Sequence, residues 1–138
     1  HCISSAASDV YKRQERGILF GIATSNGRTL AEAALKALRI EEYFTSVRTS
    51  GEVEAGKPKP DIYLKVAEDM QVQPEHCLVF EDVPMGILAG KRAGMKVCAV
   101  YDEFSRLLDL EKKQLADYYV RDFRDVMSQI KERGTDGE

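Results

Sequence analysis

Four small polar residues follow a short apolar run and suit the binding of a phosphate group: Thr24, Ser25, Asn26 and Gly27. The apolar run at residues 18–23 predicts a buried strand that ends in a turn. A helix that starts after such a turn presents free backbone N–H groups and the positive end of its dipole, and both attract anions. Ser, Thr and Asn are also preferred helix N-caps, so an ordinary N-cap is the alternative interpretation of this segment.

Lys57 lies in a loop rich in glycine and proline, within the string GKPKPD at residues 56–61. The prolines restrict the backbone and therefore limit the directions in which Lys57 can point. A fixed ammonium group could neutralise both an anionic substrate and a nearby carboxylate. The alternative is a solvated lysine in a turn, with Asp61 as the cap of the next helix.

Glu81 and Asp82 follow directly after a third apolar run at residues 77–80. Adjacent carboxylates at the end of a buried strand repel each other, and their charge must be offset. A hard cation such as Mg²⁺ does this, because it prefers oxygen ligands. The alternative is that Asp82 caps a helix and Glu81 is solvated.

Strands and helices alternate along the chain, which predicts an α/β fold with a parallel sheet between helices. The expected strands span residues 18–23, 45–50, 77–80, 97–100 and 118–120. The expected helices span residues 30–38, 62–70, 84–94, 103–115 and 123–130. Ligands of such sheets bind beyond the carboxyl ends of the strands, where the polar residues after the first and third strands are expected to lie.

In order and spacing, these segments resemble three motifs of the haloacid dehalogenase-like (HAD) hydrolases, especially the beta-phosphoglucomutase-like branch of phosphatases and phosphomutases. GIATSN at 21–26 resembles the second motif, which implies that Thr24, with Ser25 and Asn26, binds the transferring phosphoryl group. GKPKPDIYL at 56–64 resembles the third, which implies that Lys57 lies between the phosphate and the nucleophile. LVFEDVPMGILAGKRAGMKV at 78–97 resembles the fourth, which implies that Glu81 and Asp82 hold Mg²⁺ directly or through water.

The resemblance covers residues 17–125 and implies a three-layer α/β/α Rossmann-like core, but the first motif of the family is missing. That motif is an Asp-x-Asp pair, in which the first Asp attacks phosphorus and the second is the general acid and base. The sequence contains no Asp-x-Asp. The cap domain that usually follows the first motif would lie upstream of Glu15 and is also missing.

This departure predicts an incomplete parallel sheet that lacks the central nucleophile strand. In the family, that strand lies between the strands expected here at residues 18–23 and 77–80. Two half-sheets with unpaired facing edges are then expected, and such edges are costly to bury and prone to association. Either the halves close on each other, or the chain is unstable alone.

Three segments are expected along the chain. Residues 1–14 show no periodicity and resemble translated sequencing-adaptor read-through, so they are interpreted as a non-native or unstructured leader. Residues 15–133 form the partial core, and residues 134–138 form a flexible tail.

Composition restricts the partners and the location of the protein. A net charge of −3 gives no field that would attract nucleic acid or an acidic membrane surface, and no apolar run approaches the roughly 20 residues of a membrane span. The cysteines form no CxxC pair, and buried reduced thiols at Cys77 and Cys98 favour a cytoplasmic location. Composition leaves the oligomeric state open.

The sequence therefore predicts part of a Mg²⁺-dependent phosphatase or phosphomutase. By resemblance, the whole enzyme acts on small phosphorylated metabolites such as sugar phosphates through an aspartyl-phosphate. The chain as given is expected to be inactive. One alternative is a non-catalytic phosphate- or metal-binding α/β module, and another is a receiver-like signalling domain, which also has acidic residues and a lysine at strand ends.

Overall fold

The computed structural model describes residues 17–126 of the chain. The predicted leader at 1–14, residues 127–130 of the last predicted helix, and the predicted tail at 134–138 lie outside the described residues.

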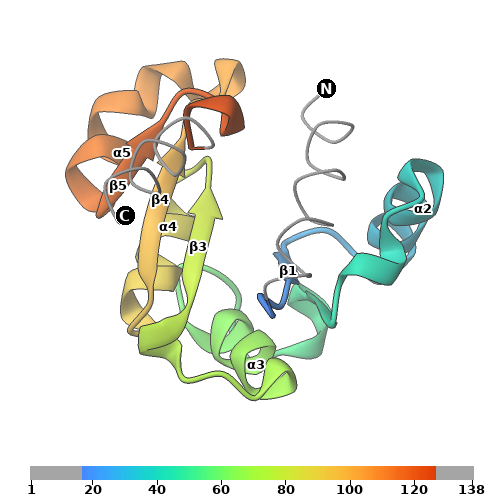
Figure 1. Cartoon of the computed structure of the whole chain (residues 1–138). Coiled ribbons are helices and arrows are strands. Elements are labelled where there is room, and N and C mark those ends of the chain that lie inside the picture. The colour runs from blue at the N-terminus through green and yellow to red at the C-terminus, as the bar shows by residue number, and fades with distance from the viewer. Residues whose placement is uncertain (1–16, 127–138) are drawn as a thin grey trace, which may run out of the picture.

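The strands of the described region form two separate parallel sheets rather than one. In the first sheet, β1 (Gly21–Thr24) pairs with β2 (Ser46–Thr49). In the second, β4 (Lys96–Val100) lies between β3 (Leu78–Glu81) and β5 (Tyr118–Val120). Figure 1 shows β1 and β3 on the facing sides of the two sheets, and among the described residues no ladder of hydrogen bonds joins them. The predicted incomplete sheet with two halves is therefore confirmed.

The helices follow the predicted pattern, with short 3₁₀ turns between them. The α-helices whose bounds lie within the described residues are α2 (Arg28–Leu38), α3 (Asp61–Met70), α4 (Pro84–Arg92) and α5 (Asp109–Leu115), and residues 123–126 are also helical. The 3₁₀ helices are η1 (Glu41–Tyr43), η2 (Ser50–Glu52), η3 (Pro74–His76) and η4 (Glu103–Leu108). No helix of the described region is long and apolar enough to cross a membrane.

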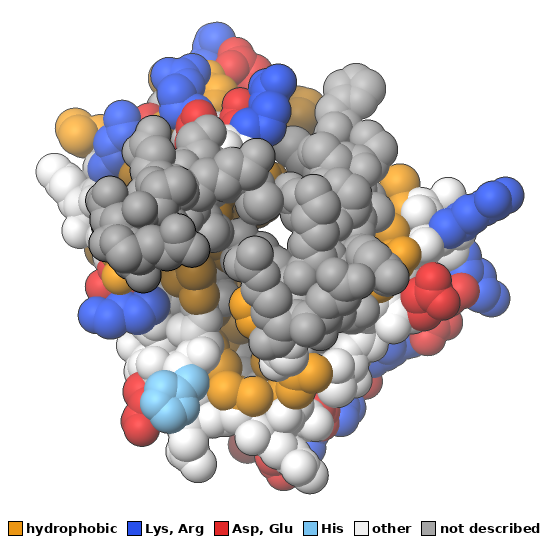
Figure 2. Space-filling view, in the orientation of Figure 1, with side chains coloured by type: hydrophobic (Ala, Val, Ile, Leu, Met, Phe, Trp, Pro, Cys, Tyr) orange, Lys and Arg blue, Asp and Glu red, His pale blue; other side chains and the backbone are white. Residues whose placement is uncertain are grey.

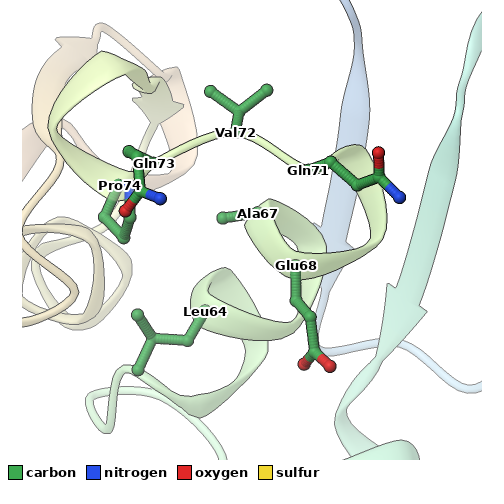
Figure 3. A pocket seen from close by; sticks show the side chains of 7 residues that line it. All are labelled: Leu64, Ala67, Glu68, Gln71, Val72, Gln73 and Pro74. Carbon is green, nitrogen blue, oxygen red and sulfur yellow. The ribbon is translucent and has the colours of Figure 1, made fainter.

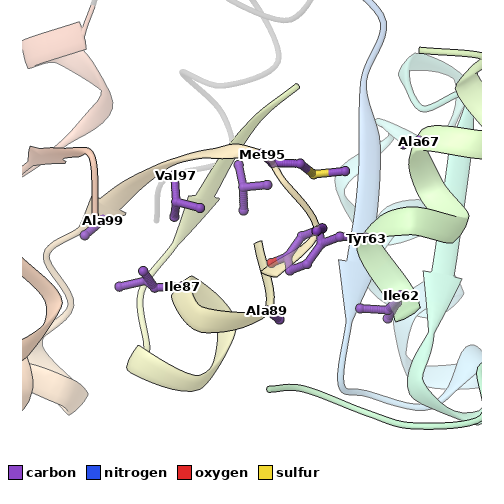
Figure 4. Packing of buried hydrophobic residues seen from close by; sticks show 10 residues of the cluster. Ile62, Tyr63, Ala67, Ile87, Ala89, Met95, Val97 and Ala99 are labelled. Carbon is purple, nitrogen blue, oxygen red and sulfur yellow. The ribbon is translucent and has the colours of Figure 1, made fainter. Parts of the chain in front are cut away.

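The main hydrophobic core lies in the second sheet and the helices beside it (Figure 4). β4 is the central strand, and its residues Val97, Cys98 and Ala99 are all buried, as expected for a parallel strand that is covered on both faces. A Cβ atom at Gly90 of α4 would lie 2.7 Å from Val97 Cγ2, so the glycine permits a close approach of helix and sheet.

Helix α3 connects the two sheets. Its residues Ile62 and Tyr63 belong to the core of the second sheet and extend toward it in Figure 4. Near its other end, Asp69 accepts hydrogen bonds from Ser46 Oγ at 2.6 Å and Arg48 Nε at 2.6 Å, both on β2. Within residues 17–126, helix α3 thus joins the two sheets, and no strand pairing does.

Two predicted segments differ in detail from the structure. The first strand begins at Gly21, and Ile18 and Leu19 before it are 43% and 46% exposed. The predicted polar helix at 103–115 is divided into η4 and α5, with non-helical backbone angles at Ser105. Periodicity alone did not predict either boundary, because both depend on which neighbouring segments supply partners.

One face of β3 is more exposed than the apolar run at 77–80 predicts. Val79 is buried, whereas Leu78 is 50% and Phe80 37% exposed. Phe80 packs against Phe123, with 5.4 Å between the ring centroids. Figure 2 shows exposed hydrophobic side chains toward the middle of one face of the molecule, between charged side chains nearer its margins.

Candidate active site

Lys57 contacts the ends of both half-sheets. Its Nζ donates a hydrogen bond of 3.2 Å to the carbonyl oxygen of Ala23 on β1 and forms an ion pair with Glu81 Oε1 on β3. The side chain of Lys57 is 10% exposed and that of Glu81 8%. Three segments that are far apart in the sequence therefore meet at the carboxyl ends of β1 and β3.

The carboxylate of Glu81 is enclosed on several sides. Besides Lys57, it accepts a hydrogen bond from the hydroxyl of Tyr63 on α3. A Cβ atom at Gly86 of α4 would lie 2.2 Å from its carboxyl carbon, so the glycine leaves the space that the carboxylate occupies. The interpretation of Glu81 as a solvated residue is therefore wrong.

The helix-cap interpretations of the polar segments are also wrong. The N-caps of α2, α3 and α4 are Gly27, Pro60 and Val83, and none makes a side-chain capping hydrogen bond. Neither Asp61 nor Asp82 caps a helix. The polar side chains at these strand ends are therefore not explained by helix capping.

Thr24 lies next to Ala23, at the end of β1 beside the Lys57 contact. Its Oγ1 accepts a hydrogen bond of 3.1 Å from the backbone N–H of Asn26, which forms a tight turn. Ser25 is exposed, and its carbonyl accepts a 3.0 Å hydrogen bond from Ser50 Oγ. Ser25 and Asn26 belong to the same exposed turn, although none of the contacts above joins them to Lys57.

Asp82 differs from Glu81 in its exposure. It lies at the surface, and its carboxylate accepts no hydrogen bond from residues 17–126. Its backbone carbonyl accepts a hydrogen bond of 2.9 Å from Ser105 Oγ. Of the two adjacent carboxylates, Asp82 is the one whose oxygens are open to a ligand.

Tyr63 is a site residue that the sequence analysis did not identify. Burial, followed by the negative charge of Glu81, raises the pKa of its hydroxyl far above the usual range, so the hydroxyl is protonated at neutral pH and donates to Glu81. Lys57 Nζ also lies 5.0 Å from the centre of its ring, within the range of a cation–π contact. The sequence showed Tyr63 only as one residue of an apolar helix stripe, and that pattern carries no information on where its hydroxyl points.

The oxygen groups at this site suit a cation such as Mg²⁺ that takes few protein ligands. Among residues 17–126 no group of three or more His, Cys, Asp or Glu side chains forms a metal cluster. Mg²⁺ usually keeps several waters and takes only one or two protein carboxylates, so Asp82 as a direct ligand with Glu81 behind it fits that pattern. Because Glu81 already accepts from Lys57 and Tyr63, it suits a water-mediated contact better than a direct one.

A hollow elsewhere on the surface is separate from these residues. It has a volume of about 380 Å³ (Figure 3). Its walls come from α3 and the segment after it: Leu64, Ala67, Glu68, Gln71, Val72, Gln73 and Pro74. None of the predicted site residues lines it.

Comparison with known families places this arrangement in a defined class. The family model of the haloacid dehalogenase-like hydrolases matches residues 4–100. The chain therefore belongs to the haloacid dehalogenase-like hydrolase family. This membership supersedes the receiver-like alternative.

Individual relatives agree with the family. A validoxylamine A 7'-phosphate phosphatase of Streptomyces hygroscopicus subsp. limoneus is 32% identical over 124 residues, which are 90% of this chain and 56% of that protein. The crystal structure of CbbY from Rhodobacter sphaeroides in complex with xylulose-1,5-bisphosphate is 26% identical, with a TM-score of 0.76, and the match covers 85% of this chain and 52% of that chain. A beta-phosphoglucomutase structure from Clostridium difficile, 24% identical with a TM-score of 0.72 over 93% of this chain and 56% of that chain, shows the same fold.

The chain is shorter than the proteins it resembles. The first two matching curated relatives are covered over 44% and 56% of their length. The chain thus spans about half the length of these relatives.

Proposed function

We propose that this chain is the carboxyl-terminal part of a Mg²⁺-dependent phosphatase or phosphomutase. In this proposal Lys57 and the turn at Thr24 bind the transferring phosphoryl group. The observation that carries the proposal is the double contact of Lys57 with Ala23 O and Glu81. It brings an ammonium group to the strand end where the Thr24 turn begins. A tetrahedral anion there would meet the lysine, the Thr24 hydroxyl and the N–H groups of the turn.

Each residue has a defined part in this proposal. Lys57 and the turn formed by Thr24, Ser25 and Asn26 bind the phosphoryl oxygens and balance their charge. Glu81 fixes the ammonium of Lys57, and Asp82, with Glu81 behind it, holds Mg²⁺. When bound, Mg²⁺ would supply positive charge that offsets the negative charge of the phosphoryl group.

The covalent chemistry requires groups that this sequence lacks. In the whole enzyme an aspartate oxygen attacks phosphorus, the P–O bond to the leaving alcohol breaks, and the alcohol takes a proton from the general acid. Water, or a second sugar hydroxyl in a mutase, then takes the phosphoryl group from the aspartate. Because there is no Asp-x-Asp here, we expect the chain as given to bind without turnover.

The substrate class is proposed from the relatives. One acts on validoxylamine A 7'-phosphate by its name, and another is bound to xylulose-1,5-bisphosphate. Both names describe phosphate esters of small polyhydroxylated molecules, which supports a small phosphorylated metabolite such as a sugar phosphate as the substrate. We place the protein in the cytoplasm, because Cys77 and Cys98 are both free and such thiols persist in a reducing compartment.

Binding of inorganic phosphate tests the proposed site directly. With Mg²⁺ present, added phosphate should shift the backbone amide resonances of Thr24, Ser25 and Asn26. Lys57→Met should weaken this binding by about tenfold or more, since a charge-assisted hydrogen bond contributes roughly 1.5–3 kcal/mol. Lys59→Met is the matched control, because Lys59 is exposed in the same loop. Shifts that are lost equally in both variants would contradict the proposed role of Lys57.

Hydrolysis tests the missing nucleophile. The purified chain should not hydrolyse p-nitrophenyl phosphate with Mg²⁺, and a longer chain that restores a strand with Asp-x-Asp should do so. Robust Mg²⁺-dependent hydrolysis by the 138-residue chain would falsify the expected inactivity. The competing interpretation, a non-catalytic binding module, would be supported if the coding sequence upstream of Glu15 contains no Asp-x-Asp.

A further inference from the structure

Lys112 is a buried charged residue that the proposed reaction does not use. It lies on α5, and its side chain is 0% exposed. A buried ammonium group is costly unless it is hydrogen-bonded or paired. Lys112 Nζ donates to the carbonyl of Val100 at 2.9 Å and to Ser105 Oγ at 3.1 Å, and Asp109 Oδ1 lies 3.8 Å away.

Ser105 connects Lys112 to the candidate active site. It is 7% exposed, and its hydroxyl lies 2.9 Å from the carbonyl oxygen of Asp82 and 3.5 Å from that of Asp102. A hydroxyl has one proton to donate, and Lys112 can only donate to the oxygen. The proton of Ser105 therefore points to a carbonyl, and the shorter contact is with Asp82.

Few other contacts hold Asp82 in place besides the hydrogen bond to its carbonyl. The N-cap of α4, Val83, makes no side-chain capping bond, and the carboxylate of Asp82 accepts no hydrogen bond from the described residues. The direction of this carboxylate thus depends on how the main chain of Asp82 is held.

We propose that Lys112 and Ser105 are positioning residues. They hold the main chain of Asp82 so that its carboxylate faces the proposed Mg²⁺ site beside Glu81. The inference rests on the proposed role of Asp82 in holding Mg²⁺. Lys112 donates a hydrogen bond to the hydroxyl of Ser105 and thereby orients it, and a second hydrogen bond joins Lys112 to Val100 at the end of β4. Ser105 in turn holds the carbonyl of Asp82, in the loop before α4. Neither side chain touches the ion or the phosphoryl group.

A purely structural role for Lys112 is the competing explanation. Its hydrogen bond to Val100 joins α5 to β4, and its loss would destabilise the protein without any consequence for Asp82. The two roles separate in Ser105→Ala, which removes the donor to Asp82 and leaves the Lys112–Val100 bond intact.

Mn²⁺ binding to the full chain is the test. Mn²⁺ substitutes for Mg²⁺ at oxygen ligands, and its unpaired electrons broaden the amide resonances of nearby residues. In the unmodified chain, Mn²⁺ should broaden the amides of Asp82 and Val83 first. Ser105→Ala should weaken Mn²⁺ binding about fivefold and shift the amide resonance of Val83, which shares a peptide group with the Asp82 carbonyl, with the urea midpoint little changed.

A second variant and its control test Lys112 itself. Lys112→Met should weaken Mn²⁺ binding at least as much as Ser105→Ala. Lys113→Met should leave it unchanged, because this neighbour on the same helix is 50% exposed and its contacts are with Asp109 and the ring of Tyr119, not with Ser105 or Val100.

The outcomes separate the inference from the proposed function. Unchanged Mn²⁺ affinity in Ser105→Ala would overturn the positioning role while Asp82 remains the ion ligand. A shifted Val83 amide resonance with unchanged Mn²⁺ affinity would leave Ser105 with a structural role only, which also overturns the inference. If Mn²⁺ does not broaden Asp82 in the unmodified chain, the proposed metal role and the inference both fail.

Discussion

The two half-sheets are stabilised in different ways. The β3–β5 half, which comprises β3, α4, β4, η4, α5 and β5, contains most of the main apolar cluster, with Ile87, Val97 and Ala99 at 0% exposure. The β1–β2 half, which comprises β1, α2, η1, β2 and η2, contributes no residue to the fully buried members of that cluster. Its buried apolar residues are Leu35 and Ile40, and charged side chains contribute much of its contacts: Arg28, Arg48 and Glu52, with Asp69 from the adjacent helix α3.

This difference predicts which part of the site unfolds first. Burial of apolar surface contributes about 25 cal/mol per Å², whereas partly exposed ion pairs each contribute roughly 0–1 kcal/mol. The β3–β5 half should therefore be the more stable of the two. Thr24 lies on the weaker half and Glu81 on the stronger one, so Lys57 joins two regions of unequal stability.

Removal of Lys57 should have the largest effect. Lys57→Met leaves the carboxylate of Glu81 buried without its cation, and loss of one partner of a buried pair typically costs about 3 kcal/mol or more. It also removes the hydrogen bond to Ala23. In urea titrations followed by amide resonances, we expect the β1 and β2 signals to be lost at lower urea than those of β4.

Lys59→Met should leave both sets of signals unchanged, since Lys59 is exposed. Hydrogen exchange offers an independent comparison. If Lys57→Met left the protection of β1 amides equal to that of β4 amides, the two halves would form one cooperative unit and the proposed difference between them would be wrong.

Substitution of Gly86 should have an intermediate effect, confined at first to the β3–β5 half. In Gly86→Ala the added Cβ would lie 2.2 Å from the carboxyl carbon of Glu81, which Lys57 and Tyr63 hold in place. Overpacking costs typically 1–3 kcal/mol, and the better helix propensity of Ala offsets roughly 1 kcal/mol of this. We expect a net loss of about 1 kcal/mol, measured by urea unfolding, together with weaker phosphate binding.

Gly51→Ala is the matched control, because a Cβ at Gly51 meets nothing within 4 Å. A Gly86→Ala variant as stable as the unmodified chain would mean that the carboxylate of Glu81 can move aside freely. The enclosed geometry of the site would then be of little energetic importance.

The sequence predicted the class of fold and the meeting of the site residues better than it predicted their contacts. The turn at Thr24 and the Glu81–Asp82 pair could be expected to converge, because the carboxyl ends of parallel strands share one edge, whereas the place of Lys57 followed from the resemblance. The missing strand ladder followed from the absence of Asp-x-Asp by resemblance. In contrast, the bond from Tyr63 to Glu81 and the burial of Lys112 depend on side-chain directions in the packed structure. Periodicity assigns a residue to one face of a helix and does not indicate which polar atom it will meet.

Acid should produce the smallest of the expected differences between the halves. Hydrogen bonds from Arg48 and then Ser46 lower the pKa of Asp69 from 3.8 to about 2, and Arg28 followed by Thr49 lowers the pKa of Glu52 from 4.5 to about 2. A folded-state pKa below the unfolded value contributes stability above the unfolded pKa, and this stability is lost as the pH falls from about 4.5 to about 2. Because these groups are partly exposed, the loss should stay at roughly 1 kcal/mol or less.

The urea midpoint of the β1 and β2 signals should therefore fall between pH 5 and pH 2, and more than that of the β4 signals. Asp69→Asn should lower the midpoint at pH 5 and reduce its further fall with acid, because one of the two titrating partners of Arg48 is gone and only Glu52 remains. Glu68→Gln on the same helix is the control, since Glu68 is 74% exposed and, among residues 17–126, forms an ion pair only with Lys65 at 3.7 Å. An equal fall for both halves in the unmodified chain would show that the charged contacts of the β1–β2 half stabilise the whole molecule rather than that half.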